Sequence, residues 1–219
     1  MNGNGQLVRN RPPHPGRRPA EDRRVRRTRR ALADALVSLV MEKRYGAITI
    51  QNLLDRADIG RSTFYAHYRG KDDLLLRSFE RMLDTFDGCV DRDGPGVDRI
   101  APVRELFRHV GEARGFHRAL SSAHMLERLY EVGVNQSTST IARRLAMRRA
   151  ADVGPSLPAA VVARAAAGAL FALLRWWIDH DAPYTADRMD GMFHALVMPG
   201  ILHTGQAPAF GPPEAAADA

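Results

Sequence analysis

The chain has 219 residues, of which 45% are hydrophobic and 26% are charged, a balance typical of a soluble globular protein. Its single cysteine, Cys89, excludes a disulfide framework, and the N-terminus lacks the apolar stretch of a secretory signal. The longest apolar run, near residues 165–174, is well short of the roughly 18 residues needed to cross a bilayer. We therefore expect a soluble, cytoplasmic protein that does not interact with membranes.

The positive charge is concentrated at the N-terminus. The formal net charge of the chain is +7, yet residues 1–30 hold ten arginines against only Glu21 and Asp22, which is a net charge of +8. The remaining 189 residues therefore sum to −1. Such asymmetry is typical of an arm that binds nucleic acid, because neutralising phosphates releases condensed counterions.

The first helix is expected at about residues 22–44. Residues 1–20 contain four prolines and no hydrophobic period, which indicates a disordered basic arm. No proline occurs from Glu21 to Asp93, so long helices are permitted there. Apolar residues such as Leu32, Leu36 and Leu39 recur with the helical period until Gly46.

Two short helices follow, separated by a three-residue turn. Thr49 is a good N-cap for a helix over residues 50–57, and Asp58, Ile59 and Gly60 interrupt the pattern before it resumes in the segment RSTFYAHY. This arrangement matches a helix-turn-helix. In its second helix we expect Phe64 to be the core anchor, whereas a set of polar residues faces outward: Arg61, Ser62, Thr63, Tyr65 and His67.

The rest of the chain is expected to be helical as well. A long amphipathic helix begins after Gly70, and further helices are predicted at about 100–114, 116–123, 124–150, 159–181 and 186–202. Residues 91–99 form a loop. The fold class is therefore all-α with about nine helices. We divide it into a disordered basic arm (1–20), a helix-turn-helix domain (21–70), a C-terminal helical domain (71–203) and a disordered tail (204–219).

Residues 24–75 resemble the DNA-binding domain of the TetR family of bacterial transcriptional regulators. The resemblance lies in the basic first helix ending in Tyr45-Gly46 and in the segment ITIQNLLDRADIGRSTFYAHYRGKDDLL. Two positions depart from the family pattern. Asp58 stands where glycine is common in the turn, and Asp tolerates left-handed backbone angles. Gly60 stands where the family usually has serine at the start of the recognition helix.

The resemblance assigns eight positions to DNA binding. Arg61 is suited to bidentate contact with guanine, and Ser62 and Thr63 to either kind of base edge. Tyr65 and His67 suit phosphate contacts. Thr49 and Lys71 begin helices whose free amides also attract phosphate. The full set is Thr49, Gly60, Arg61, Ser62, Thr63, Tyr65, His67 and Lys71.

Similarity to the family also implies a C-terminal helical domain that binds a small effector and forms a homodimer. Aromatic and methionine side chains that suit a ligand pocket, or else an ordinary helical core, are Phe107, Phe116, Met125, Tyr130, Phe171 and Trp176. For the dimer interface we expect Leu170, Leu174, Trp177, Phe193 and Val197. Trp176 and Trp177 point about 100° apart on a helix, so one should face the pocket or core and the other a partner.

Other chemistries fit the sequence poorly. Gly70-Lys71 lacks the upstream glycine and the following Ser/Thr of a phosphate loop. The histidines form no tight metal-binding pair, and there is no nucleophile elbow, so we expect no metal, no cofactor and no enzymatic activity. The expected function is a ligand-responsive regulator, in the first instance a repressor, that binds a palindromic operator in double-stranded DNA as a dimer. The alternative is a helical protein–protein interaction module with a degenerate helix-turn-helix.

Overall fold

The computed structural model describes residues 19–92, 99–121, 125–149 and 157–202. Within these ranges the chain contains helices and no β-strand, which confirms the all-α prediction. The α-helices are α1 (Pro19–Glu42), α2 (Ile50–Ala57), α3 (Arg61–Tyr65), α4 (Lys71–Arg92), α5 (Val103–Glu112), α6 (Arg114–Ser121), α7 (Met125–Arg149), α8 (Ala159–Asp179) and α9 (Ala186–Leu202), with a 3₁₀ turn, η1, at Tyr45–Ala47. The arm up to residue 18, most of the loop at 91–99 and the C-terminal tail lie outside the described residues.

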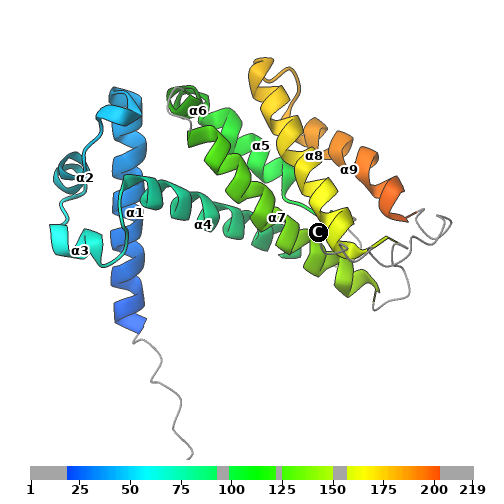
Figure 1. Ribbon diagram of the computed structural model, residues 1–219, viewed down its shortest axis with the longest axis horizontal. Coiled ribbons are helices and arrows are strands. Elements are labelled where there is room, and N and C mark those ends of the chain that lie inside the picture. Colours follow the sequence, from blue (N-terminus) through cyan, green and yellow to red (C-terminus); the bar gives the residue numbers. More distant parts are fainter. Residues whose placement is uncertain (1–18, 93–98, 122–124, 150–156, 203–219) are drawn as a thin grey trace, which may run out of the picture.

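The helices α1, α2 and α3 form a small group at one end of the molecule (Figure 1). The apolar face of α1 buries Leu32 and Leu36 against Leu53 of α2 and Phe64 of α3, and all four side chains are almost inaccessible to solvent. Leu74, in the first turn of α4, completes this first core. Burying side chains of this size stabilises the group by about 2 kcal/mol each.

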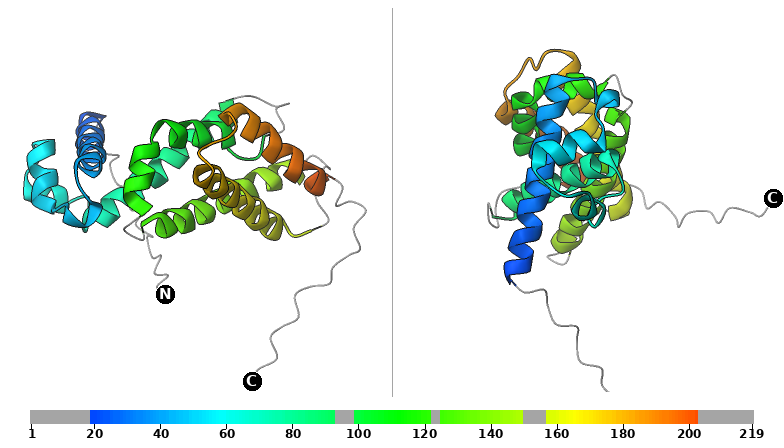
Figure 2. Two further views of the ribbon diagram at one scale, coloured as in Figure 1. Left: turned by 90° about the horizontal axis from the view of Figure 1, so that it is seen from above. Right: turned by 90° about the vertical axis from the view of Figure 1, so that its left-hand side faces the viewer.

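The helix α4 leads from the N-terminal group to the bundle of α5–α9 (Figures 1 and 2). In that bundle, α7 and α8 pack closely because Gly133 has no side chain: a Cβ at this position would overlap the ring of Phe171. A second core fills the bundle and includes Phe107 and Phe193. The first core also takes in Leu120 and Met125, so the ends of α6 and α7 pack against the N-terminal group.

Two buried ionic clusters fix the bundle. The guanidinium of Arg99 lies 2.5 Å from a carboxylate oxygen of Glu105 and 3.1 Å from Asp190, which ties the start of α5 to α9. The guanidinium of Arg144 lies 3.2 Å from Asp87 and joins α7 to α4. Because breaking a buried ion pair leaves an uncompensated charge, these contacts fix the relative positions of the helices.

By length and mean hydropathy (1.5), α8 could cross a membrane. Core helices of soluble proteins meet the same criteria, and eight side chains of α8 are buried in the second core.

Candidate nucleic-acid interface and pocket

The helix α2 begins with a capping box. The hydroxyl oxygen of Thr49 accepts a hydrogen bond from the backbone N–H of Asn52 at 3.1 Å, and the Asn52 side chain accepts one from the Thr49 N–H at 3.1 Å. The predicted N-cap is therefore confirmed. Arg56 holds α2 to α1 by a bidentate ion pair with Glu42 and a hydrogen bond to Ser38. Lys43, the residue after α1, donates to Asn52 of α2 at 2.6 Å.

The turn between α2 and α3 relies on a left-handed residue. Asp58 has φ 52° and ψ 51°, a conformation that glycine adopts readily and that aspartate tolerates. The next residue, Ile59, donates its N–H to the carbonyl of Leu54 at 3.1 Å. Gly60 then acts as the N-cap of α3 without a side-chain hydrogen bond, and a Cβ at this position would face open space.

The short helix α3 separates a buried face from an exposed one. Phe64 is fully buried, and its ring contacts the rings of Tyr65 and Tyr68. Arg61 and Ser62 are exposed, and half of the Tyr65 side chain is accessible to solvent. Three of the five residues expected to face outward are therefore exposed, whereas Thr63 and His67 are only partly exposed. The helix ends at Tyr65, three residues before the expected end, so His67 lies in the following turn.

Lys71 was expected to contact a phosphate, but its side chain turns toward the protein instead. Its ammonium donates to the carbonyls of Tyr45 and Ile48 at 2.8 Å each and to that of Gly46 at 3.3 Å, and it lies 4.8 Å from the centre of the Tyr45 ring. An ammonium has three N–H donors, so these contacts occupy all of them. In this structure Lys71 joins α4 to the 3₁₀ turn η1 and presents no free donor to a phosphate.

The same corner links the two groups of helices. The hydroxyl of Tyr45 donates to the carboxylate of Asp72 at 2.7 Å, and Arg128 of α7 forms an ion pair with the other Asp72 oxygen at 3.0 Å. Burial and the Asp72 carboxylate raise the pKa of Tyr45 above its ordinary value, so the hydroxyl remains a donor. A polar chain therefore runs from η1 through α4 to the N-terminal end of α7.

The N-terminal half of α1 carries exposed arginines. It projects beyond α2 and α3 (Figure 2). The exposed residues are Arg23, Arg24, Arg26, Arg27 and Arg30. Only a long contact between Arg30 and Asp34, at 3.7 Å, pairs one of them with an acidic side chain in the described residues. Their charge is therefore available to an anionic partner.

A cavity of about 370 Å³ lies where α6, α7 and α8 meet. Its walls combine apolar and charged side chains: Arg114, His117, Leu126, Glu127, Tyr130, Arg175, Trp177, Ile178, Asp179, Asp181 and Ala182. Burial lowers the pKa of His117 to about 4, with a smaller contribution from His109, so this imidazole is neutral at pH 7. Among the residues that the structure describes, no group of three potential metal ligands occurs.

The cavity only partly matches the predicted ligand pocket. Tyr130 lines it, whereas Phe107 and Phe171 belong to the second core and Phe116 and Met125 pack with the first. The two tryptophans are exchanged relative to the prediction: Trp177 is buried and lines the cavity, and Trp176 is exposed. The missed residues include the polar side chains Arg114, His117 and Arg175, which a search for aromatic and methionine side chains alone does not find.

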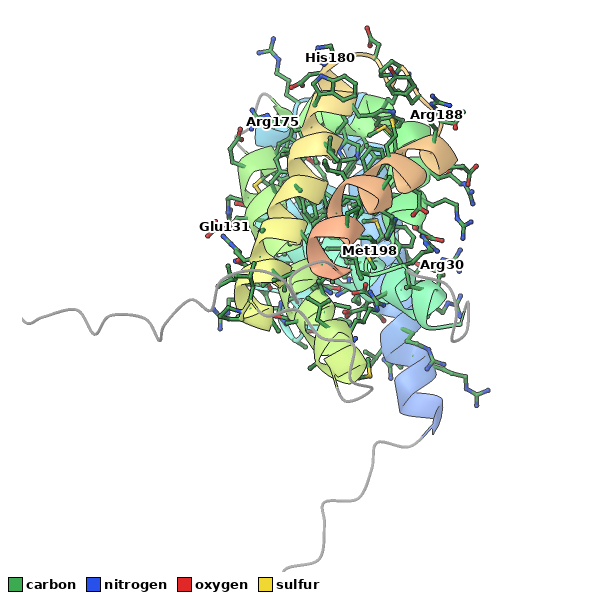
Figure 3. The ribbon with its side chains drawn as sticks, turned by 90° about the vertical axis from the view of Figure 1, so that its right-hand side faces the viewer. Arg30, Glu131, Arg175, His180, Arg188 and Met198 are labelled. Atoms are coloured by element: carbon green, nitrogen blue, oxygen red, sulfur yellow. The ribbon has the colours of Figure 1, made fainter. Side chains whose placement is uncertain are left out.

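Most residues expected at a dimer interface are inside the protomer. Leu170, Leu174, Trp177 and Phe193 are buried in the second core and present no free surface, whereas Val197 packs against this core and remains partly exposed. The exposed apolar side chains of α8 and α9 are instead Val161, Trp176, Met192 and Leu196. These two helices lie side by side at the end of the molecule remote from α3 (Figures 1 and 3).

Comparisons with known proteins agree with this geometry. Residues 32–77 match the model of bacterial regulatory proteins of the tetR family. A segment of 71 residues is 44% identical to an uncharacterized HTH-type transcriptional regulator of Bacillus subtilis, YxbF; it covers 31% of this chain and about a fifth (19%) of that relative's length.

Solved structures extend the similarity of fold to most of the chain. The dihydroxyacetone kinase operon activator DhaS superposes with a TM-score of 0.58 at 18% identity, over 80% of this chain and 96% of that protein. A TetR-family transcriptional regulator from Syntrophomonas wolfei gives 0.52 at 16% identity, over 79% and 94%. The fatty acid degradation regulator FadR from Bacillus halodurans gives 0.53 at 14% identity, over 78% and 98%. These proteins are named as regulators or activators, not as enzymes.

Proposed function

We propose that this chain, whose N-terminal helix-turn-helix domain belongs to the TetR family of bacterial regulatory proteins, binds double-stranded DNA as a homodimer and regulates transcription in response to a small effector. The observation that carries the proposal is the division of α3. Phe64 holds the helix to the core, while Arg61, Ser62 and Tyr65 stand exposed beside it. A helix anchored in this way can enter a major groove with its first residues at the base edges.

The geometry supports distinct roles for the exposed residues. Arg61 donates to the side-chain oxygen of Gln51 at 2.8 Å, which orients the guanidinium between α2 and α3. A bidentate contact from Arg61 to guanine is the main base contact we propose, with Ser62 and Thr63 beside it. Tyr65, His67 and Thr49 would contact phosphates. Gly60 leaves room for the DNA backbone to approach the start of α3.

The exposed arginines of α1 extend this surface. Each phosphate that they neutralise would add about 0.9 to the negative slope of log K against log salt concentration. Deleting residues 1–20 should lower this slope, since Arg9, Arg11, Arg17 and Arg18 are removed. An unchanged slope would mean that the basic arm makes no contact with DNA.

Dimerisation is proposed through the exposed faces of α8 and α9. Val161, Trp176, Met192 and Leu196 place large apolar side chains at the surface of two adjacent helices, where a second copy would bury them. Two copies joined there would carry two recognition helices, which must reach successive major grooves about 34–36 Å apart on a palindromic operator. Sedimentation of the parent chain and of Leu196→Glu tests this: the variant should sediment as a monomer.

The cavity beside α7 is the proposed effector site. An effector can change DNA binding only if it binds more tightly to one of two protomer conformations than to the other. The chain from Arg128 through Asp72 to Tyr45 supports such coupling, because it joins the α7 end of the cavity to the first core. We propose repression as the outcome, since a bound dimer occupies the DNA.

Selection from a random pool of duplexes tests DNA binding and assumes no operator sequence. The full chain should enrich a palindrome, and Arg61→Met should lose most of the affinity for it while keeping its dimeric state. A reporter gene placed behind the selected site then distinguishes repression from activation. Failure of the parent chain to enrich any duplex would favour the alternative, a helical protein–protein interaction module.

A further inference from the structure

The cavity between α6, α7 and α8 contains two arginines that rest on aromatic rings. The guanidinium carbon of Arg114 lies 5.7 Å from the centre of the Trp177 ring, and that of Arg175 lies 5.7 Å from the centre of the Tyr130 ring. Stacking on a ring holds a guanidinium in place while leaving the donors at its edge available. The two rings thus position two positive charges at the cavity wall.

Neither arginine is strongly paired with the protein. Among the described residues, Arg114 donates one long hydrogen bond, 3.4 Å to the carbonyl oxygen of Asp181, and Arg175 reaches Glu127 at 3.5 Å. Both distances lie beyond the range of strong charge-assisted hydrogen bonds, about 2.7–2.9 Å. Because each guanidinium has five N–H donors, most of them remain available to a bound molecule.

Three carboxylates also line the cavity, so the count of charges alone does not decide between an anionic and a cationic ligand. Glu127, Asp179 and Asp181 are exposed, as are Arg114 and Arg175, but it is the two arginines that rest on aromatic rings of the cavity wall. A cationic ligand would find no free face on Trp177 or Tyr130, because arginine already lies over both rings, and Glu127 already lies 3.5 Å from Arg175. The tip of the Trp177 ring is closed as well, because Gly111 lies against it, where even a Cβ would come within 3.1 Å.

We infer that the effector of this protein is an organic anion, a carboxylate on an apolar body, whose charge is held between Arg114 and Arg175. This inference rests on the proposed effector site. The remaining wall suits the apolar body, since Leu126, Ile178 and Ala182 face the same cavity. A volume of about 370 Å³ falls within the usual range for small-molecule sites.

Matched sets of compounds test the charge directly. The probes are decanoate, decanamide and decylamine, together with 2-naphthoate, 2-naphthamide and 2-naphthylmethylamine, so that only the head group changes within each set. The readouts are the melting temperature of the full chain and the heat of binding. At least one carboxylate should raise the melting temperature, while its amide and amine do not. A rise in melting temperature with an amine would overturn the inference, and so would the absence of a rise with every carboxylate.

Variants identify the site. Arg114→Gln with Arg175→Gln should weaken carboxylate binding at least ten-fold, whereas the control Arg143→Gln, an exposed α7 residue outside the cavity, should bind as the parent does. Equal affinity in the double variant and the parent would show that the anion binds elsewhere.

Duplex binding measured in the same samples separates this inference from the function. Carboxylate binding without any duplex binding leaves the anion site standing and contradicts the proposed regulator. Duplex binding without carboxylate binding supports the proposed regulator and contradicts the anion site.

Discussion

Replacing Lys71 with methionine should destabilise the protein more than it weakens the electrostatic part of DNA binding. Met keeps an apolar stem over the Tyr45 ring but removes the three donors. The two 2.8 Å bonds, to the carbonyls of the buried residues Tyr45 and Ile48, matter most. A hydrogen bond to a charged group contributes about 1.5–3 kcal/mol, and water will replace part of each. We therefore expect a loss of about 3 kcal/mol, or about 6–12 °C in melting temperature.

The measurement is thermal unfolding followed by circular dichroism, paired with duplex affinity at several salt concentrations. The matched control is Arg61→Met, which removes an exposed charge from α3 and should change the melting temperature by only a degree or two. If Lys71 contacts a phosphate instead, Lys71→Met will leave the melting temperature unchanged and lower the salt slope by about 0.9. That pair of results would refute the structural role of this lysine.

Three further predictions follow from packing, titration and coupling. Gly133→Leu should prevent close packing of α7 on α8, because Phe171 occupies the space, and should lower the melting temperature by about 5 °C or more (roughly 2 kcal/mol) in a thermal melt. His117 binds a proton in the unfolded chain near pH 6.5 but in the folded chain only near pH 4, so stability should fall as pH is lowered between these values. In urea titrations at pH 7 and pH 4.5, the parent should lose about 2–3 kcal/mol more stability than His117→Gln does. Arg128→Gln removes the ion pair with Asp72 and should reduce the effect of an effector on duplex affinity while leaving effector-free affinity within about two-fold; an unchanged effector response in a binding titration would show that coupling runs elsewhere.

Local signals made the helix-turn-helix domain predictable. Thr49 begins α2 because its hydroxyl can satisfy a free amide three residues on, and this depends only on neighbours in sequence. Asp58 adopts the left-handed conformation that its position in the turn requires. Phe64 is the apolar residue in a polar segment, so its burial follows from composition.

Features that depend on distant segments were not predictable. Lys71 satisfies carbonyls that lie 23 to 26 residues earlier in the chain, and no local pattern predicts that approach. The helix α8 is apolar around most of its circumference, so the periodicity of its sequence does not predict which face is buried. For this reason the predicted sides of Trp176 and Trp177 are wrong, and Leu170 and Leu174 are core residues.

Gly60 has a consequence for how related proteins can diverge. Its backbone has φ −69° and ψ 149°, which any residue adopts, and a side chain there would point into open space. Substitution at position 60 therefore costs the fold little, and serine would even add a cap to α3. The same position adjoins the first residues proposed to read bases. In the proposed complex with DNA, a substitution at position 60 can therefore change the surface beside the recognition residues at little cost to folding.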